Sequence, residues 1–596
     1  MKRTVYKKSI NDNNYLKIEI EGENIFCHFK EEDFGKYKII RFTMSPGSEE
    51  KVVLNNLIVT VRTPIIDIHG ISIPGKVNNP YLYILPWYVE EYINLYKEFP
   101  FVSLINRKGE NKFSIGIKDP RLGFKLSGKI FEKSEEFEMN ISSVSSIVSK
   151  SLDFEIFISD YPDTWFEITG EYSNWANSQQ DRLPDWMYDP VYCSWYAFYQ
   201  EVNQDHLEHV AQEAYNLGFK IFILDDGWFT FDNNRGYWYT GDWEVYKGKF
   251  PNFKKHVENV QKIGMKYVLW VAPFMFGKKS KNYELLSKYS VKTRDNLGFE
   301  DLCPQSNFTK YRIVNVLSKL LTKYNLDGFK LDFIDDLPVE PCLNDFHEHF
   351  TDNPSHGVES ILKEIKQKLE EASNKQLILE FRQQYANPLL KDYSTAFRAA
   401  DTPFDFDQNR RRIINIRSFS GSFPVYSDPI VWKKGESTEN ISRHFISCIF
   451  SVPMLSVDLL KLDEREKKVI KFWTDFFMKN RETLLFGKFV PEFSCGDFTQ
   501  AFAFSQYEKK LIIALYTKNV LSFENLKEFL SDTSEMYILN GSNNRELIIL
   551  DDSINKRTID LEIFDPVVGL KSKLKQEFSK FLKIDLGIGN ILKITL

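Results

Sequence analysis

The chain has 596 residues, of which 43% are hydrophobic and 15% aromatic, so it is long enough for several domains with large cores. A formal net charge of −6 with interspersed signs excludes a basic footprint for nucleic acid or anionic membranes. No apolar run approaches the roughly 20 residues of a membrane span, and the basic N-terminus lacks the apolar stretch of a secretory signal. Six scattered cysteines without CxxC spacing favour reduced thiols in a cytoplasmic protein over a disulfide or zinc framework.

The first 174 residues consist of short runs with β-type alternation, broken by turn residues. No long amphipathic helix interrupts these runs, which predicts an antiparallel β-sandwich over residues 1–174. The polar, Pro-bearing segment at residues 175–188 is typical of a linker.

Beyond residue 188, apolar strand candidates alternate with amphipathic helical patterns. This alternation predicts a (β/α)8 TIM barrel over residues 189–482. Short strands return afterwards, so the predicted fold is α/β, with the barrel followed by a second antiparallel β-sandwich over residues 483–596. The eight candidate barrel strands are residues 191–196, 219–226, 266–273, 328–333, 376–382, 396–401, 423–428 and 454–459.

The fourth candidate strand carries two charges in the apolar segment DGFKLDF. Side chains alternate across a strand, so Lys330 and Asp332 share a face. Burying both charges is costly unless that face opens onto a polar site. In a TIM barrel the C-terminal ends of the strands form the active site, and both residues fall at such an end.

Charged residues also gather at the ends of the other candidate strands. Any single carboxylate has a structural explanation, such as capping the next helix. Acidic ends on most of the strands together favour catalysis. The residues are Asp225 and Asp226 on the second strand, Glu380 and Arg382 on the fifth, Arg398 and Asp401 on the sixth, Asp428 on the seventh and Asp458 on the eighth, with Trp195, Trp243 and Trp270 nearby.

No GxSxG elbow, P-loop or GxGxxG follows a strand, so the sequence shows no other motif of this kind. Paired carboxylates without such a motif predict glycoside hydrolysis. One carboxylate attacks or activates water, and the other protonates the leaving oxygen. Lys330 would keep Asp332 ionised, as a nucleophile requires. Nearby negative charge would raise the proton affinity of Asp401, as an acid requires, while Arg398 acts in the opposite direction.

No metal or cofactor is expected. His206 and His209 lie three apart on a predicted helix, and His347 and His349 lie two apart in FHEHF, but neither pair has a third ligand at a sensible spacing. In the segment DFDQNRRR, Asp407 is predicted to cap a helix and residues 410–412 to form a solvated basic face.

Six motifs together resemble those of the α-galactosidases of glycoside hydrolase family 36, in clan D. The family has a barrel between two β-sandwiches, which agrees with the predicted architecture. The motifs run in the family's order through residues 185–460 and are ILDDGW, NNRGYWYTGDWEVYKGKFPNF, GMKYVLWVAPFMFGKKS, DGFKLDF, LEFRQQYANP and FRAADTPFDFDQNRRRI.

The resemblance implies that Asp332 is the nucleophile and Asp401 the acid/base. It also implies that Asp225 and Asp226 bind the galactose hydroxyls, including the axial one that distinguishes galactose from glucose. The other implied roles are packing against the sugar for Trp243, hydroxyl binding for Lys330 and Arg398, support of the site for Glu380 and Arg382, and a pocket wall for Trp195.

The chain departs from the family pattern around the acid/base. The family more often has Gly before this Asp and Cys after it, whereas Ala400 and Thr402 stand here, which would change the pocket floor. The N-terminal sandwich is also shorter than in the longest members. This puts the family's tetrameric assembly in doubt and leaves a homo-oligomer open.

The function expected from the sequence is a retaining, exo-acting α-galactosidase that hydrolyses small galactosides such as melibiose or raffinose in the cytoplasm. An α-N-acetylgalactosaminidase or a galactosyl-transferring enzyme would use the same carboxylates and is the alternative. A non-catalytic galactoside-binding protein is a further alternative, against which the intact Asp332 and Asp401 argue.

Overall fold

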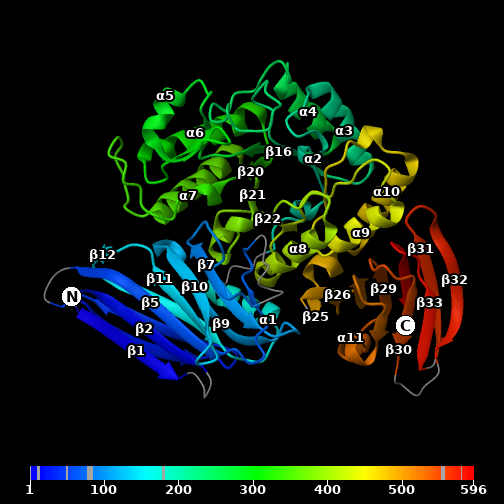
Figure 1. The fold of residues 1–596 in the computed structure, drawn as a ribbon. Helices are drawn as coiled ribbons and strands as arrows, with labels where there is room; N and C mark the ends of the chain where they lie inside the picture. The colour runs from blue at the N-terminus through cyan, green and yellow to red at the C-terminus, as the bar shows by residue number, and fades with distance from the viewer. Residues whose placement is uncertain are drawn as a thin grey trace.

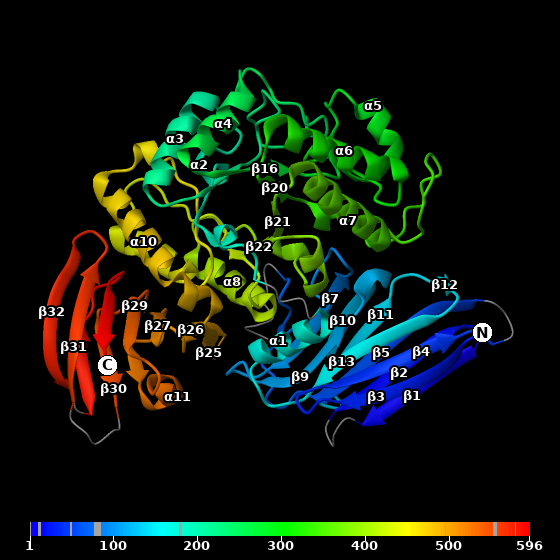
Figure 2. The same cartoon turned by 180° about the vertical axis from the view of Figure 1, so that it is seen from behind.

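The computed structural model describes residues 2–9, 14–47, 51–76, 85–177, 182–494, 496–551, 557–578 and 580–596. Within these ranges the chain forms an N-terminal pair of sheets, a central barrel and a C-terminal pair of sheets (Figure 1). The view from behind shows the two sheet domains on either side of helix α8 (Phe406–Ser420), below the barrel (Figure 2). No helix in the described ranges is long and apolar enough to cross a membrane.

Two antiparallel sheets form the N-terminal domain, as predicted. Alternating apolar residues such as Ile18 and Val59 of one sheet and Ile40 and Phe154 of the other are buried in a common core. The first sheet has the order β1 (Lys2–Ser9), β2 (Tyr15–Glu23), β5 (Val52–Pro64), β11 (Glu136–Ser143), β10 (Phe124–Phe131) and β7 (Tyr88–Ile93), with β12 (Ile147–Ser149) paired to β5. The second has the order β3 (Phe26–Asp33), β4 (Lys38–Ser45), β13 (Leu152–Ser159), β9 (Asn111–Ile117), β8 (Phe101–Ile105) and β6 (Gly70–Ser72).

Helix α1 (Trp165–Ala176) follows these sheets and was not predicted. The Thr164 side chain caps it by accepting a hydrogen bond from the backbone N–H of Glu167, and its apolar face is buried. Its Ser173 hydroxyl donates to the backbone oxygen of Phe419 in α8 at 2.7 Å, which joins the domain to the barrel. Residues 178–181 of the predicted linker lie outside the described ranges.

The central sheet has eight parallel strands, and each predicted barrel strand contains one of them. The strand order is β23, β22, β21, β20, β16, β15, β14 and β24, and parallel bridges from Tyr426 to Val452 and from Ile430 to Leu455 close the circle. The predicted TIM barrel is therefore confirmed. The bounds are β14 (Val191–Cys193), β15 (Ile221–Leu224), β16 (Lys266–Val271), β20 (Gly328–Leu331), β21 (Ile378–Arg382), β22 (Ala396–Arg398), β23 (Val425–Tyr426) and β24 (Met454–Leu455).

Helices surround the barrel, except between β21 and β22, where two short 3-10 turns, η6 (Gln383–Tyr385) and η7 (Pro388–Asp392), replace the helix. A small antiparallel sheet is inserted after β16 and contains β17 (Met275–Gly277), β18 (Ser290–Arg294) and β19 (Phe299–Leu302). The surrounding helices are α2 (Trp195–Phe198), α3 (Gln204–Asn216), α4 (Phe253–Ile263), α5 (Tyr283–Leu286), α6 (Asn307–Tyr324), α7 (Pro354–Ser373), α8, α9 (Thr438–Cys448) and α10 (Glu464–Phe486).

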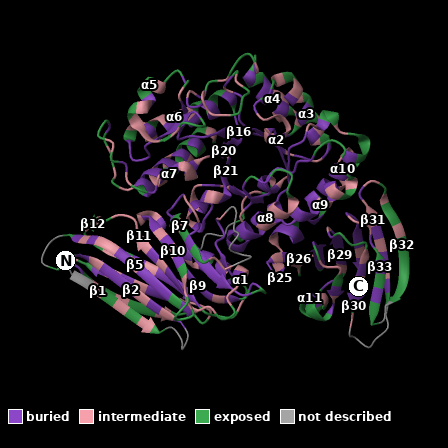
Figure 3. Cartoon of the chain, in the orientation of Figure 1, coloured by how far each residue is buried: buried purple, intermediate pink, exposed green. Residues whose placement is uncertain are grey.

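Helix α8 corrects two predictions. Its N-cap is Asp405, whose carboxylate accepts from the backbone N–H of Gln408, whereas Asp407 lies in the first turn. The predicted solvated basic face is wrong, because Arg410 is 2% and Arg412 is 5% exposed. The helix is buried between the barrel and the C-terminal domain (Figure 3), where the Arg410 guanidinium lies 4.2 Å from the centroid of the Tyr516 ring.

The C-terminal domain contains two sheets that share a separate apolar core. Most neighbouring strands are antiparallel, but β27 and β29 are parallel, as are β28 and β30. One sheet is ordered β25 (Lys488–Ser494), β26 (Asp497–Ser505), β27 (Lys510–Leu515), β29 (Glu535–Asn540), β34 (Ile591–Thr595), β31 (Arg557–Asp565) and β32 (Gly569–Phe578). The other is ordered β28 (Val520–Ser522), β30 (Glu546–Leu550) and β33 (Phe581–Asp585), and the short helix α11 (Lys527–Leu530) lies between β28 and β29.

Candidate active site

Lys330 and Asp225 form an ion pair inside the mouth of the barrel. The Lys330 Nζ lies 2.6 Å from the Asp225 Oδ2, and the two side chains are 5% and 3% exposed. The Cys193 thiol donates to the same Asp225 oxygen at 3.3 Å. Burial alone would lower the pKa of Lys330, but the Asp225 carboxylate raises this pKa above its ordinary value. Lys330 therefore stays protonated in its buried position, because the strand face that carries it opens onto an acidic site.

Asp332 directly follows β20 and is held by three donors. Its Oδ2 accepts from the Trp270 indole at 3.0 Å, while its Oδ1 accepts from the Phe333 backbone at 2.9 Å and lies 3.3 Å from the Arg382 Nη1. Burial alone would raise the pKa of Asp332. Arg382, followed by Lys330, outweighs this effect and lowers the pKa below its usual value. Asp332 is therefore an oriented carboxylate, which suits a nucleophile.

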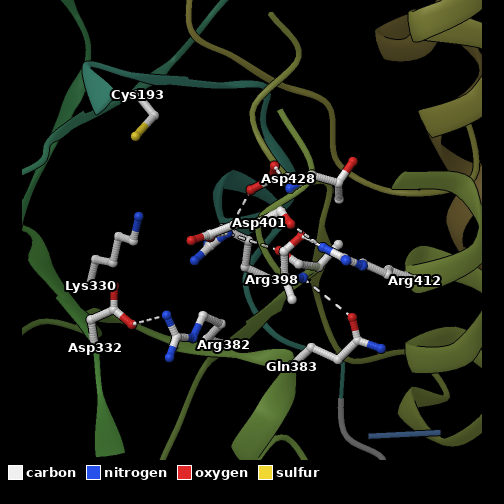
Figure 4. Close-up of polar contacts among 12 residues, drawn as sticks. Cys193, Lys330, Asp332, Arg382, Gln383, Arg398, Asp401, Arg412 and Asp428 are labelled. Atoms are coloured by element: carbon white, nitrogen blue, oxygen red, sulfur yellow. Dashed lines mark hydrogen bonds and ion pairs between the residues drawn. The ribbon is translucent and has the colours of Figure 1, made fainter. Parts of the chain in front are cut away.

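Asp401 lies across the site from Asp332 and is the most exposed of the predicted site acids, with 51% of its side chain accessible. The close-up shows Lys330 and Asp332 on one side and Arg398, Asp401 and Asp428 on the other (Figure 4). The Nη1 of Arg398 donates to the Asp401 Oδ1 at 3.0 Å. Both predicted catalytic carboxylates therefore face the same space.

The expected rise in the proton affinity of Asp401 is wrong for this geometry. Burial acts to raise its pKa, but Arg398, Arg382 and Lys330 together lower the pKa well below the usual range. Arg398 is the strongest of these cations because it contacts the carboxylate directly. These cations therefore favour the carboxylate form of Asp401, which is the form that a general base requires.

Arg398 joins three carboxylates through a guanidinium that is 1% exposed. Besides Asp401, it donates from Nε to the Glu380 Oε1 at 2.9 Å and from Nη1 to the Asp428 Oδ1 at 2.7 Å. Asp428 also accepts from the Tyr196 hydroxyl at 2.9 Å, and burial raises its pKa to about 7. These contacts indicate that Arg398 and Asp428 position Asp401, and hydroxyl binding by Arg398 stays a prediction.

Asp226 has a buried oxygen that is available to a ligand. The Gln200 amide donates to the Asp226 Oδ2 at 2.7 Å, whereas the Oδ1 has no hydrogen-bond partner among the described residues. Burial, together with the Asp225 charge, raises the pKa of Asp226 to about 7. Unpaired buried oxygens are costly, so this atom is suited to accept a hydrogen bond from a substrate hydroxyl.

Aromatic rings wall one side of the site. The Tyr237 and Phe229 rings both stack on Trp270, with centroids 6.3 Å away in each case. Trp243 is only 5% exposed and packs edge-to-face against Trp270 at 5.9 Å, so in this structure it supports the wall from behind. Trp195, which was predicted on the first strand, instead begins helix α2, where the Arg235 guanidinium lies 5.1 Å from its ring centroid.

The remaining predicted residues make contacts with other protein groups that give them a structural role. Glu380 is 1% exposed, and burial raises its pKa, while Arg382 also bonds Asp335 at 2.9 Å. Asp458 caps the turn η8 (Leu459–Lys461) and lies outside the cluster. The Thr402 hydroxyl donates to the backbone oxygen of Asp405 at 2.8 Å, so it points away from the site.

The sequence prediction missed three residues that complete the site, namely Cys193, Gln200 and Tyr237. Cys193 ends β14 and contacts Asp225, while Gln200 follows helix α2 and contacts Asp226. The position of Cys193 at a strand end was the available signal, but an uncharged side chain at such a position is common, and Gln200 and Tyr237 lie in loops. Only the packing of β14 against β15 shows that Cys193 faces the acids.

A barrel whose strand ends bring together two opposed carboxylates and a set of buried hydroxyl-binding acids defines a glycosidase-like site. Residues 151–370 match the melibiase family model. Residues Asp225, Asp226, Lys330 and Asp332 lie inside this match, and Asp401 lies beyond it. This stretch of the chain is therefore similar to the melibiase family.

Comparison with curated proteins extends the likeness. The α-galactosidase Mel36A of Lactobacillus acidophilus is 40% identical over 176 residues, which are 26% of this chain and 23% of that protein. The A type blood α-D-galactosamine galactosaminidase of Flavonifractor plautii is 26% identical over 273 residues, which are 41% of this chain and 24% of that protein. The chain thus matches less than a quarter of the length of these relatives.

Solved structures show the same fold. The family 36 α-galactosidase AgaA of Geobacillus stearothermophilus, in complex with raffinose, superposes with a TM-score of 0.60 at 14% identity, over 100% of this chain and 86% of that one. The α-galactosidase TtGalA of Thermus thermophilus, in complex with p-nitrophenyl α-D-galactopyranoside, gives 0.51 at 17% identity over 75% and 94%. In sequence and fold the chain therefore resembles the α-galactosidases of glycoside hydrolase family 36.

The raised pKa of Asp226 predicts a pH-dependent stability. The pKa of an unfolded Asp is about 3.9, whereas that of folded Asp226 is about 7. A raised carboxyl pKa stabilises the fold fully below about pH 4, and this stability is lost as the pH rises through about 7. Asp226→Asn cannot ionise. The free energy of unfolding of this variant, relative to that of the wild type, should therefore increase by about 1 kcal/mol for each pH unit between about pH 4 and 7.

Urea unfolding of both proteins across this pH range measures the difference. Asp332→Asn is the matched control, because the pKa of Asp332 is lowered and its pH dependence lies below about pH 4. A constant difference between Asp226→Asn and the wild type across the range would contradict the assignment.

Proposed function

We propose that the protein is a retaining, exo-acting α-galactosidase that hydrolyses small α-galactosides by double displacement. The observation that supports this proposal is that two carboxylates lie on opposite sides of the mouth of the barrel. Asp332 is kept ionised and oriented by Arg382 and Trp270, and the half-exposed Asp401 faces the same space. Such a pair is the minimum machinery for cleaving a glycosidic bond.

In the proposed first step, an oxygen of Asp332 attacks the anomeric carbon while Asp401 gives a proton to the departing glycosidic oxygen. The products are a galactosyl ester of Asp332 and the free aglycone alcohol. In the second step, Asp401 takes a proton from water, whose oxygen attacks the anomeric carbon and releases Asp332. The second step returns both carboxyl groups to their starting states and consumes one water.

The first step requires a proton on Asp401, although the surrounding cations lower its pKa. Burial is the one effect that acts to raise this pKa, and the side chain is still half-exposed. A bound glycoside that covers Asp401 would exclude water and strengthen that effect. The proposal therefore requires that substrate binding protonate Asp401.

Recognition of galactose is proposed to rest on Asp225 and Asp226. The free Oδ1 of Asp226 supplies an acceptor for one hydroxyl, and Asp225 is fixed by Lys330 and Cys193. Hydrogen bonds to charged groups contribute roughly 1.5–3 kcal/mol each.

The five described cysteines are free thiols, which supports the expectation of a reducing, cytoplasmic compartment.

The catalytic roles predict different losses for the two carboxylates. Asp332→Ala should abolish turnover, and azide should partly restore cleavage of a nitrophenyl galactoside by entering the vacated space. Asp401→Ala should lower kcat/KM on melibiose by roughly 10²–10⁴-fold, but much less on nitrophenyl galactoside, whose leaving group needs little protonation. Steady-state kinetics on both substrates measure these effects.

Asp458→Asn is the matched control, since this strand-end carboxylate caps a turn outside the cluster and its variant should keep near-normal kinetics. If Asp332→Ala retained substantial activity on melibiose, the assignment of the nucleophile would be wrong.

A second candidate function is the α-N-acetylgalactosaminidase that the sequence leaves open. The Flavonifractor plautii relative is named for α-D-galactosamine, a galactose with nitrogen at C2, and this name favours testing sugars substituted at that position. An α-N-acetylgalactosaminidase would use the same two carboxylates but accept a larger group at C2. The discriminating experiment compares kcat/KM for nitrophenyl α-galactoside, α-N-acetylgalactosaminide and α-glucoside. We expect the galactoside to exceed each of the others by at least about 100-fold, roughly the loss of one or two charged hydrogen bonds. Preference for the acetamido sugar would select the second function, and binding without any turnover would reject both.

A further inference from the structure

Four metal-binding side chains converge outside the catalytic cluster, although none of them was expected to bind a metal. They are Cys303, Cys342, His347 and His349, and their ligand atoms all lie within 4.8 Å of one another. Cys303 directly follows β19, in the insertion after the third barrel strand. The other three lie in the segment 337–353, between the turn η5 (Ile334–Asp336) and α7. Two separate loops therefore contribute to one cluster.

The distances suit a tetrahedral ion. Zinc bonds to His nitrogen at about 2.0 Å and to Cys sulfur at about 2.3 Å, which gives tetrahedral edges of about 3.3–3.8 Å. The Cys342 Sγ and the His347 Nε2 are 3.8 Å apart, and the Nε2 atoms of His347 and His349 are 3.0 Å apart. Small shifts of the side chains would bring all four ligands to bonding distance.

The His347 ring is already oriented for ligation. Its Nδ1 lies 2.9 Å from the backbone oxygen of Lys288. Because the Nδ1–H donates to that carbonyl, the neutral ring presents the lone pair of its Nε2 to the cluster. Metal-binding histidines characteristically donate their second N–H in this way, which fixes the tautomer.

The surrounding backbone holds the two cysteines in place. Cys303 is fully buried and Cys342 is 9% exposed, and both are free thiols. The Gln305 side chain accepts from the Cys342 N–H and donates to the Thr351 oxygen, at 2.8 Å in each case. The backbone N–H of Gln305 also hydrogen-bonds to the Cys303 thiol. One residue thus connects both ends of the cluster.

The segment 337–353 is held by individual hydrogen bonds, such as that from the Asn344 amide to the Ser290 oxygen at 3.1 Å, and not by secondary structure. It contains no helix or strand, and it exposes Leu343 by 89% and Phe346 by 88%. Irregular loops of more than about 12–15 residues are uncommon in compact domains unless something organises them. A metal that joins this segment to Cys303 would supply that organisation.

We propose that Cys303, Cys342, His347 and His349 bind one zinc ion as a structural site. Two thiolates and two neutral imidazoles neutralise Zn²⁺, so the cluster would carry no net charge in its buried position. Four protein ligands leave no open position for water or substrate, which excludes a role as a catalytic metal.

The site would stabilise the segment that follows Asp332. Strand β18, which is paired with β19, carries Lys292, whose Nζ lies 3.3 Å from the Asp336 Oδ1. Asp336 belongs to η5, immediately before the segment 337–353. Zinc would therefore add a second link between the two loops that this ion pair already joins. This inference does not depend on the proposed galactosidase activity.

Metal analysis of the full chain, purified from zinc-supplemented cultures, tests the proposal. We expect one zinc per chain that survives dialysis. After chelation, added Co²⁺ should give thiolate-to-cobalt charge-transfer absorption and the strong visible bands of tetrahedral cobalt. Zinc removal should lower the melting temperature, and its return should restore it. The melting measurement keeps the test valid even if a ligand variant folds poorly.

Cys342→Ser and His349→Ala should each weaken zinc binding by more than the roughly 10–100-fold typical of outer-shell changes. The double variant His206→Ala/His209→Ala removes two histidines on α3 and is the matched control, which should retain one zinc per chain. Three results would overturn the proposal. They are a metal-free protein without cobalt absorption, a Cys303–Cys342 disulfide detected by thiol titration, and zinc binding unchanged in the ligand variants.

Discussion

The ion pairs of the buried Arg398 guanidinium are the constraint on which the site depends. A buried cation is costly unless its donors are paired, and those of Arg398 are paired with Glu380, Asp401 and Asp428. These acids come from the fifth barrel strand and from the segments that follow the sixth and seventh. The barrel brings them together because its parallel strands all end at the same mouth. Arg398 thereby fixes Asp401 at a defined position relative to Asp332.

The charges of the site divide into two groups. Lys330, Arg382 and Arg398 are paired with Asp225, Asp332 and Asp401, respectively. Burial raises the pKa of the three other acids, which are Asp226, Glu380 and Asp428. Glu380 and Asp428 share the Arg398 guanidinium with Asp401, and one oxygen of Asp226 has no partner among the described residues. The site thus combines an oriented Asp332 carboxylate with acceptors for hydrogen bonds, which suits a ligand with many hydroxyl groups.

The barrel and the place of its site could be predicted because strand–helix alternation and charged strand ends are local properties of the sequence. The rest depends on distances that the sequence does not contain. The pKa of Asp401 falls because Arg398 contacts it directly, and Arg410 is buried because the C-terminal domain packs on α8. The Cys303 cluster was missed because its members come from two loops that only the fold brings together. Helix α1 was missed because its sequence, WFEITGEYSNWA, is rich in aromatic and β-branched residues and contains a Gly, which are weaker helix formers.

The configuration of the first product shows whether Asp332 attacks the anomeric carbon. Two carboxyls about 5 Å apart act by double displacement, whereas inverting enzymes hold them roughly 6.5–9.5 Å apart to admit a water. Proton NMR of the galactose formed from a nitrophenyl α-galactoside, recorded before mutarotation, distinguishes the two mechanisms. Attack by Asp332 requires that α-galactose appear first and the β-anomer only later. If β-galactose appeared first, water and not Asp332 would be the attacking group.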